Sequence, residues 1–321
     1  MTGVTGVFAL EARQLTKRYS QTVLAVDHLD LAVQKGEIFG LLGPNGAGKT
    51  TTGGMLTTRI VPTSGNAFIG GIDVVAHPAE AKREIGVVPQ TNTLDRSLSV
   101  EQNLYFHGRY FGYSRNEAKT RASQLLEQFK LSERSSAPVA ALSGGMAQRL
   151  MMARAVFHQP TVLILDEPTS GLDPQSRLAF WDVLRELHSS GQTVLLTTHY
   201  MEEADQLCER LAIMDHGRIL AIGSPSELKS GIKSGSILTV EVSGEVLGLT
   251  EQLRKELKDS SVDSVTASAN GMVIIGDEAS KLISPVVRIA EASGHSVLNL
   301  KVEEPSLETV FISLTGRELR E

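Results

Sequence analysis

The chain lacks the features of a disulfide-bonded, secreted or membrane-spanning protein. Its single cysteine, Cys208, excludes an internal disulfide and gives no cysteine-based metal site. No run approaches the roughly 18 apolar residues of a membrane span, and the first ten residues have neither a basic start nor a long apolar stretch. We therefore expect no membrane span, no secretory signal and a reducing compartment.

The chain also lacks a surplus of positive charge. It has 31 basic and 37 acidic residues, for a net charge of -6. This balance disfavours nonspecific binding to nucleic acid, so no nucleic-acid partner is expected. With 321 residues, of which 41% are hydrophobic, the chain is long enough for two globular domains, the larger with a full core.

What the chain does have is a glycine-rich stretch between an apolar run and a potential helix. Residues 43–51 read Gly-Pro-Asn-Gly-Ala-Gly-Lys-Thr-Thr and follow the apolar run 38–42. Glycine allows left-handed backbone angles and close approach of N–H groups to an anion, and a helix that begins near Gly48 adds its positive dipole end. The pattern predicts a phosphate cradle in which Lys49 reaches the β- and γ-phosphates and Thr50 ligates Mg²⁺.

A second helix N-terminus of the same kind is predicted within residues 142–149, Leu-Ser-Gly-Gly-Met-Ala-Gln-Arg. Ser143 is a good N-cap, and Gly144 and Gly145 leave the N–H groups of the first turn uncovered for an anion. Taken alone, the motif is equally well explained as a plain N-cap.

Polar residues follow two apolar runs that are typical of parallel strands. Asp166 and Glu167 come after the run 162–165, and His199 follows the run 192–197. Ligands of open parallel sheets gather at the carboxyl ends of strands. We expect Asp166 to hold Mg²⁺ and Glu167 to accept a proton from the attacking water. His199 can donate to a γ-phosphate oxygen there, although a lone histidine at a strand end is more often structural.

The remaining pattern divides the chain into two domains. The first covers residues 1–225, with an antiparallel β patch near its start and a helical subdomain at about 91–158. A domain boundary is expected in residues 223–235, which are rich in Gly, Ser and Pro, with the linker at 226–235. The rest, 236–321, has the order βαββαβ, which is typical of a ferredoxin-like domain. It shows no catalytic constellation, so we expect docking or regulation there.

Together, these motifs resemble the nucleotide-binding domain of ABC transporters in order and spacing, over about residues 8–225. The resemblance implies an α/β fold: a P-loop ABC ATPase domain with a mixed sheet, an antiparallel β subdomain and a helical subdomain, followed by a small α+β domain. It also implies the family's role for each motif. These motifs are the Walker A loop at 43–51, the Q-loop at Gln90, the signature at 142–148, Walker B at 162–167, the D-loop at Leu172–Asp173 and the switch histidine His199.

The resemblance implies a full set of site residues. Catalysis is expected of Lys49, Gln90, Glu167 and His199, and Mg²⁺ is expected at Thr50, Gln90 and Asp166. Tyr19, by itself an ordinary sheet tyrosine, lies where the family has an aromatic that stacks on adenine. The residues expected to contact ATP are Tyr19, Gly43, Pro44, Asn45, Gly46, Ala47, Gly48, Lys49, Thr50, Thr51, Ser143, Gly144, Gly145 and Asp173.

In this family the cradle and the signature close on one ATP from two different chains, which implies a head-to-tail homodimer around two Mg-ATP. Residues 304–316 are similar to the C-terminal end of the daunorubicin-resistance type of ATPase subunit. That type works with a separately encoded integral membrane permease, so this resemblance implies a drug-exporter subunit held peripherally at the cytoplasmic face of the membrane. Met146 departs from the usual Gln of the signature, and we expect altered contacts without loss of ATP binding.

Two alternatives remain at this point. A soluble ABC ATPase of DNA repair or translation usually has two nucleotide-binding domains in one chain or long inserted arms, whereas this chain has one such domain and an acidic tail. An ATP-dependent switch with little turnover is disfavoured by the presence of Glu167. The transported substrate is not predicted, because in this family the permease lines the translocation path.

Overall fold

The computed structural model describes residues 8–231, 237–244, 246–257, 262–268, 271–276, 279–303 and 306–315. By their contacts these residues form two compact units, which meet in the sequence between Ser224 and Pro225. Among the helices of the described ranges, none combines the length and the apolar character that a membrane crossing needs.

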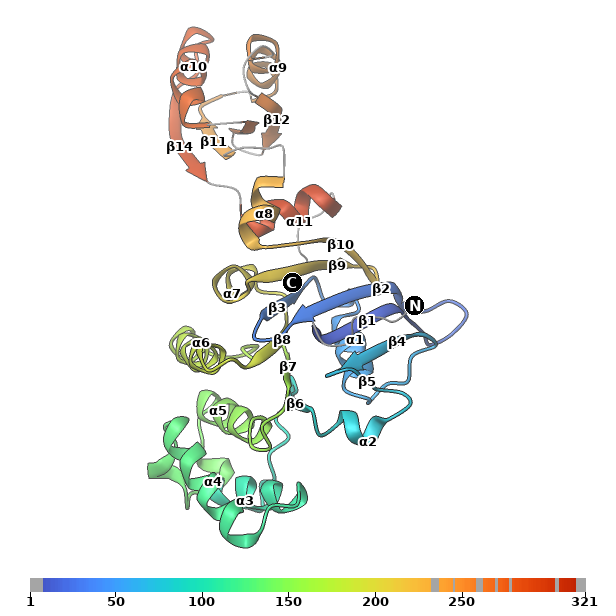
Figure 1. The fold of residues 1–321 in the computed structure, drawn as a ribbon. Coiled ribbons are helices and arrows are strands. Elements are labelled where there is room, and N and C mark those ends of the chain that lie inside the picture. Colours follow the sequence, from blue (N-terminus) through green and yellow to red (C-terminus); the bar gives the residue numbers. More distant parts are fainter. Residues whose placement is uncertain are drawn as a thin grey trace. The chain divides into compact units, whose positions relative to one another are not determined.

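The first unit is built on a mixed six-stranded sheet in the order β10-β9-β3-β8-β7-β6 (Figure 1). Its strands are β3 (Ile38–Leu42), β6 (Ile85–Val88), β7 (Val162–Asp166), β8 (Thr193–Thr198), β9 (Arg210–Asp215) and β10 (Arg218–Gly223). All pairs are parallel except β9 with β10 at the edge. The continuous apolar sequences of β3 and β7 follow from this position, since a parallel sheet is covered on both faces.

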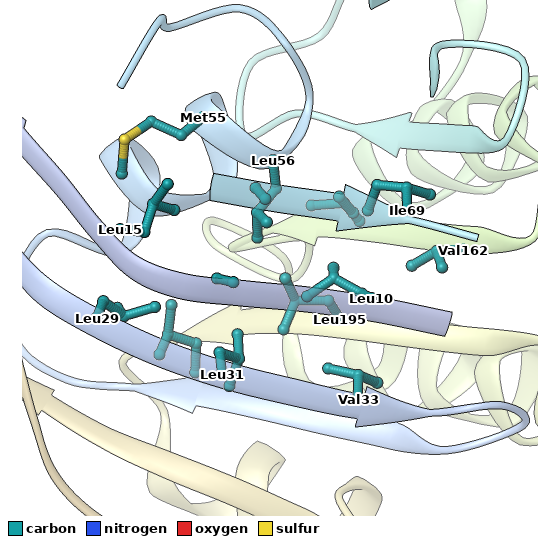
Figure 2. Close-up of a cluster of buried hydrophobic side chains, with 14 of the residues drawn as sticks. Leu10, Leu15, Leu29, Leu31, Val33, Met55, Leu56, Ile69, Val162 and Leu195 are labelled. Carbon is teal, nitrogen blue, oxygen red and sulfur yellow. The ribbon is translucent and has the colours of Figure 1, made fainter. Parts of the chain in front are cut away.

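A second, antiparallel sheet has the order β2-β1-β4-β5. It consists of β1 (Phe8–Arg18), β2 (Leu24–Gln34), β4 (Ser64–Ile69) and β5 (Ile72–Asp73). Helix α1 (Lys49–Leu56) packs against strands of both sheets. Figure 2 shows the core that the two sheets share with this helix, which includes Leu10, Leu15, Leu29, Leu31, Val33, Met55, Leu56, Ile69, Val162 and Leu195. Each fully buried leucine contributes about 1.5–3 kcal/mol, so this core holds α1 against both sheets.

Helices occupy much of the first unit between its strands. They are α2 (Pro78–Ala81), α3 (Val100–Tyr110), α4 (Arg115–Gln128), the short 3-10 turns Ser132–Arg134 and Val139–Ala141, α5 (Gly144–Ala155), α6 (Pro174–Ser189) and α7 (Met201–Leu207). Helices α3 to α5 lie in the range where the sequence predicted a helical subdomain. Capping boxes at Ser99 and Ser114 start α3 and α4. Helices α6 and α7 lie on the other side of the six-stranded sheet from α1 (Figure 1).

The second unit contains a four-stranded antiparallel sheet in the order β12-β13-β11-β14. Its elements are α8 (Pro225–Gly231), β11 (Ile237–Val242), α9 (Val246–Glu256), β12 (Val262–Ser268), β13 (Gly271–Gly276), α10 (Ala279–Ala292), β14 (Val297–Glu303) and α11 (Leu307–Thr315). The predicted βαββαβ order is present, and the unit is a small α+β domain of the ferredoxin-like kind.

The predicted linker at 226–235 differs from the structure. Residues up to Gly231 belong to the helix α8, whereas 232–236 lie outside the described residues. Pro225 begins this helix, because its fixed φ angle suits a first helical position, and Leu228 buries its side chain. Pro225, which in the sequence indicates a domain boundary, is therefore the first residue of a helix.

Candidate nucleotide-binding site

The loop between β3 and α1 borders a small cavity at the carboxyl edge of the six-stranded sheet. The cavity has a volume of about 180 Å³. It is lined by Ala25, Asn45, Gly46, Gly48, Lys49, Thr50, Thr51, Gln90 and Glu167. Gly43, Pro44 and Ala47, which were also predicted to contact ATP, belong to the same loop without lining the cavity.

The glycines of this loop are required by its backbone. Gly46 and Gly48 have φ angles of 82° and 107°, which side chains rarely adopt. A Cβ atom on Gly48 would lie 2.5 Å from the carbonyl oxygen of Ala25. Gly48 is also the N-cap of α1 and has no side chain to cap it, so the first N–H groups of the helix remain available to an anion.

Glu167 follows β7 in a strained conformation. Its φ angle is 46°, an uncommon value for a residue with a long side chain. Its backbone N–H donates to the carbonyl oxygen of Thr197 at 3.0 Å and to the Thr197 hydroxyl at 3.1 Å. These bonds hold the strained turn, and they keep the Glu167 side chain beside the cavity with only 7% of its surface exposed.

Three other predicted catalytic residues converge on the Glu167 carboxylate. The Lys49 ammonium lies 3.1 Å from Oε1, and the Gln90 side-chain N–H donates to Oε2 at 3.2 Å. The Nδ1 atom of His199 lies 3.1 Å from Oε2 but is not aligned for a hydrogen bond. Lys49 also donates to the carbonyl oxygens of Gly43 and Pro44, at 2.7 and 3.0 Å. The fold thus brings Lys49, Gln90, Glu167 and His199 into one cluster.

The residues predicted to bind Mg²⁺ offer oxygen ligands at the same edge. The Thr50 hydroxyl donates to Asp166 Oδ1 at 3.4 Å, and the Thr197 hydroxyl donates to the same oxygen at 2.7 Å. No group of three or more His, Cys, Asp or Glu side chains suited to a metal occurs among the described residues. Mg²⁺ commonly uses one or two carboxylates together with phosphate oxygens, so Thr50 and Asp166 fit this ion. Gln90 bonds Glu167 through its nitrogen, which leaves its side-chain oxygen as an acceptor.

The remaining predicted contacts with ATP lie away from the cavity lining. Ser143 is exposed and caps α5, its hydroxyl accepting from the Met146 N–H at 3.3 Å. Asp173 caps α6 by accepting from the backbone N–H and the hydroxyl of Ser176. Gly145 lies against the start of α6, since a Cβ on it would be 2.8 Å from the Ser176 Oγ atom. Within this chain Ser143 and Asp173 act as helix caps, and Gly145 allows α5 to pack closely on α6.

Tyr19 is also separate from the cavity lining. The residue is 55% exposed, and the Lys17 ammonium lies 5.1 Å from the centroid of its ring. An exposed aromatic face is compatible with stacking on an adenine, so this expectation stays a prediction.

Sequence reasoning missed two residues of the site. Ala25 lines the cavity and places its carbonyl oxygen under Gly48. Thr197 bonds both Asp166 and Glu167, and it is paired with Asp166 in the sheet register. Its position at the end of a strand was the available signal, because polar side chains at neighbouring strand ends meet at one edge.

Comparisons with known proteins identify the family of the chain. The family described as ABC transporter matches residues 26–170. The linearmycin resistance ATP-binding protein LnrL of Bacillus subtilis is 38% identical over 97% of this chain and 100% of its own length. The Nod factor export ATP-binding protein I of Ralstonia nicotianae is 40% identical, over 99% of this chain and 97% of its own.

Solved structures are similar as well. A structure of an ATP-binding subunit of an ABC transporter has a TM-score of 0.63 at 30% identity, over 70% of this chain and 92% of that one. A structure of cbiO1 from Clostridium perfringens, part of an ABC transporter complex, has a TM-score of 0.65 at 25% identity, over 79% of this chain and 97% of that one.

Proposed function

The chain belongs to the ABC transporter family as an ATP-hydrolysing subunit of the export type, and we propose that it drives a separate membrane permease through the site described above. The observation that supports the assignment of the site is the position of Glu167, whose carboxylate is surrounded by Lys49, Gln90 and His199 next to the cradle.

In the proposed reaction, Lys49 changes its partner. Its ammonium pairs with Glu167, and its side chain is 4% exposed. This ammonium is the cation that the β- and γ-phosphates of ATP would meet in the cradle. Once Lys49 binds the phosphates, the Glu167 carboxylate is free to accept a proton from the attacking water. Gln90 holds the carboxylate through its other oxygen, and His199 donates to a γ-phosphate oxygen.

Mg²⁺ held by Thr50 and Asp166, with the side-chain oxygen of Gln90, would neutralise charge on the phosphates when it is bound. Thr197 orients the Asp166 carboxylate for this ion by donating to Oδ1, at 2.7 Å. The adenine would lie on the exposed ring of Tyr19.

We propose that a second copy of the chain completes each site. The cavity of about 180 Å³ is small beside the roughly 300–1,000 Å³ of pockets that enclose a small molecule. Ser143 and Gly144 are exposed at the start of α5, where N–H groups and the helix dipole favour an anion. A head-to-tail homodimer would place this terminus and the neighbouring Asp173 against the ATP that the other chain holds.

The permease would bind in a groove of the first unit. This groove has a volume of about 1120 Å³ and is lined by residues of α2, β6 and the C-terminal ends of α3 and α5. Lys82, Arg83 and Arg154 outnumber the one acidic residue of its lining, Glu84, so the proposed occupant is an acidic cytoplasmic segment of the permease. Arg154 also donates to the carbonyl oxygen of Thr93 at 2.8 Å, three residues after Gln90, which connects the groove to the catalytic cluster.

The names of the relatives, linearmycin resistance and Nod factor export, favour an exporter of the drug-resistance type. Since the permease would line the path, its identity decides the substrate. We propose that the chain lies at the cytoplasmic face of the membrane and is held there by the permease. The C-terminal unit would serve docking or regulation.

The experiment is affinity purification of tagged Glu167→Gln from membranes of its native host, in mild detergent with Mg-ATP. We expect an ATP-bound dimer together with a stoichiometric multispanning protein, because the new amide cannot accept the proton while the cradle stays intact. Lys49→Ala, which weakens the grip on phosphate, is the matched control and should give no ATP-dependent dimer. Wild-type turnover by Glu167→Gln would overturn the proposed site. A dimer without a membrane partner would instead favour a soluble ABC ATPase.

A further inference from the structure

A carboxylate that none of the motifs includes lies completely buried behind the catalytic cluster. Glu203, on α7, has no exposed surface. Its Oε1 atom accepts a hydrogen bond from the Thr169 hydroxyl at 2.8 Å and another from the indole N–H of Trp181 at 3.1 Å. Both donors are themselves buried. The three side chains come from the turn after β7, from α6 and from α7.

Packing alone does not explain this carboxylate. A buried charged group costs stability unless charges or hydrogen bonds compensate for lost water, and fully buried glutamates are rare. The second oxygen of Glu203, Oε2, has no hydrogen-bond partner in the part of the chain that the structure describes. An apolar side chain of similar size would fill the space without that cost. The presence of Glu203 is therefore explained by the hydrogen bonds that its Oε1 atom accepts from Thr169 and Trp181.

The two donors belong to segments that carry the site. Thr169 follows Glu167 by two residues, in the turn where the Ser170 N–H donates to the Glu167 carbonyl oxygen. Trp181 lies on α6, which begins at its N-cap Asp173. Glu203 itself lies four residues after His199. The Oε1 atom of Glu203 thus connects the turn after Glu167, helix α6 and helix α7, which follows His199.

A second contact joins the same two helices. The ring of Tyr200, the N-cap of α7, lies 4.1 Å from the His199 ring between centroids. The guanidinium of Arg177, one turn before Trp181 on α6, lies 4.5 Å from the centroid of the Tyr200 ring. The position of His199 therefore depends on how α6 and α7 are held together.

We propose that Glu203 is a positioning residue for ATP hydrolysis, which holds His199 and the Glu167 turn in one arrangement through Thr169 and Trp181. This rests on the proposed roles of Glu167 and His199. Because Glu203 is outside the cavity lining, its removal should disturb the catalytic step and leave the grip on ATP unchanged.

The test compares steady-state ATP hydrolysis by the full-length wild type, Glu203→Ala, Glu203→Gln and Glu202→Ala. We expect Glu203→Ala to lower kcat about tenfold with an unchanged KM for ATP, as is typical when a supporting partner of a site residue is lost. Glu203→Gln should recover most of the activity, because its amide oxygen can accept both hydrogen bonds. Glu202 is the exposed neighbour on the same helix, so Glu202→Ala should behave as the wild type.

Several outcomes would overturn the proposal. These are wild-type kcat in Glu203→Ala, equal losses in the Ala and Gln variants, or a loss that appears in KM. If Glu203→Ala does not fold, Thr169→Val and Trp181→Phe each remove one donor, and wild-type kcat in both contradicts the proposal. Inactivity of Lys49→Ala and Glu167→Gln in the same assay would show that the proposed function stands even if this inference fails.

The contact itself can be observed in solution, because Trp181 is the single tryptophan of the chain. Its fluorescence therefore reports on the indole N–H that donates to Glu203. We expect a changed emission spectrum in Glu203→Ala, a nearly wild-type spectrum in Glu203→Gln and no change in Glu202→Ala. An unchanged spectrum in Glu203→Ala would show that the hydrogen bond does not exist in solution.

Discussion

Two helix N-termini of the first unit resemble each other in sequence and differ in structure. Helices α1 and α5 both begin among glycines. The N-cap of α1 is Gly48, with a φ angle of 107° and no side-chain cap, whereas the N-cap of α5 is Ser143, whose hydroxyl accepts from the Met146 N–H. The start of α1 leaves its N–H groups to a ligand, and the start of α5 satisfies one of its own.

The residues around the starts of α1 and α5 also differ, in burial and in charge. The start of α1 lies beside Lys49 and Glu167, which are 4% and 7% exposed, whereas Ser143 and Gly144 at the start of α5 are exposed. Hydrolysis of a phosphate at a glycine-rich helix start needs a cation and a base as well, and at the start of α1 the fold supplies both. The start of α5 is exposed and lies against the start of α6, near Asp173, which fits a surface that meets a ligand on another chain.

The largest expected effect is on the chemistry at α1. Lys49→Ala should lower ATP turnover by about a thousandfold, the scale of losing a cation that stabilises phosphoryl transfer. Turnover is measured as phosphate release by the purified chain, with Lys35→Ala as the control, because Lys35 is an exposed lysine outside the cavity lining. Wild-type turnover in Lys49→Ala would contradict the view that the start of α1, unlike the start of α5, carries the catalytic cation.

The second prediction compares one glycine from each terminus. Gly48→Ala should lower the free energy of unfolding by about 2 kcal/mol or more, because its φ angle is 107° and the new Cβ would lie 2.5 Å from the Ala25 carbonyl oxygen. In Gly144→Ala the new Cβ would lie 3.6 Å from a Leu172 methyl carbon, an ordinary contact. Alanine is also the better helix former, by up to about 1 kcal/mol.

Denaturant unfolding of both variants measures this comparison. Gly144→Ala should be as stable as the wild type or slightly more so, and its own fold provides the control for Gly48→Ala. Equal losses in the two variants would contradict the view that only the α1 loop depends on glycine geometry.

The third prediction concerns the cap of α5. Ser143→Ala should cost about 1 kcal/mol of stability, as is typical when a serine N-cap is lost. Binding of one ATP by the monomer should be unchanged, whereas the ATP-dependent dimer of a Glu167→Gln background should weaken. Sedimentation with and without Mg-ATP measures the dimer. Ser143→Asn keeps a good cap, so it should restore stability, and a monomer with impaired ATP binding in Ser143→Ala would contradict the proposed division between chains.

The sequence predicted most of the region around the start of α1. The apolar runs became β3 and β7, because a strand buried on both faces needs a continuous apolar sequence. The cradle was predictable because its chemistry lies in one short stretch, in which Gly46 and Gly48 carry the left-handed backbone. The cluster of Lys49, Gln90, Glu167 and His199 was expected from the family motifs, and the fold does bring these four together.

Other parts were beyond the sequence because they depend on which strands and helices become neighbours. Thr197 reaches Asp166 since β8 lies beside β7 in the sheet; its strand-end position indicates the sheet edge, but not which strand is the neighbour. Glu203 meets Thr169 and Trp181 only after α6 and α7 pack. The helix α8 was missed for the opposite reason, since a local sign, Pro225, has two structural meanings.

The smallest expected effect concerns the cap of α6, next to the start of α5, and separates the role of Asp173 in helix stability from its predicted contact with ATP. Hydrogen bonds from the hydroxyl and the backbone N–H of Ser176 lower the pKa of Asp173 from its ordinary value of 3.8. The folded pKa lies below the unfolded one. The charged carboxylate therefore adds stability above the unfolded pKa, and this added stability is lost as the pH falls through the folded pKa.

Asn is an equally good N-cap without a titrating group, so Asp173→Asn should match the wild-type stability at neutral pH. Thermal unfolding measured from about pH 5 to about pH 3, where such carboxylates titrate, should then fall more steeply for the wild type than for Asp173→Asn. Parallel curves would show that Asp173 does not stabilise α6 as a charged cap, and a fall in stability of the Asn variant at neutral pH would show that the charge itself is needed. If the first result holds, any loss of ATP-dependent dimerisation in Asp173→Asn cannot come from a weakened helix, and it must come from the contact that the charge makes with another chain.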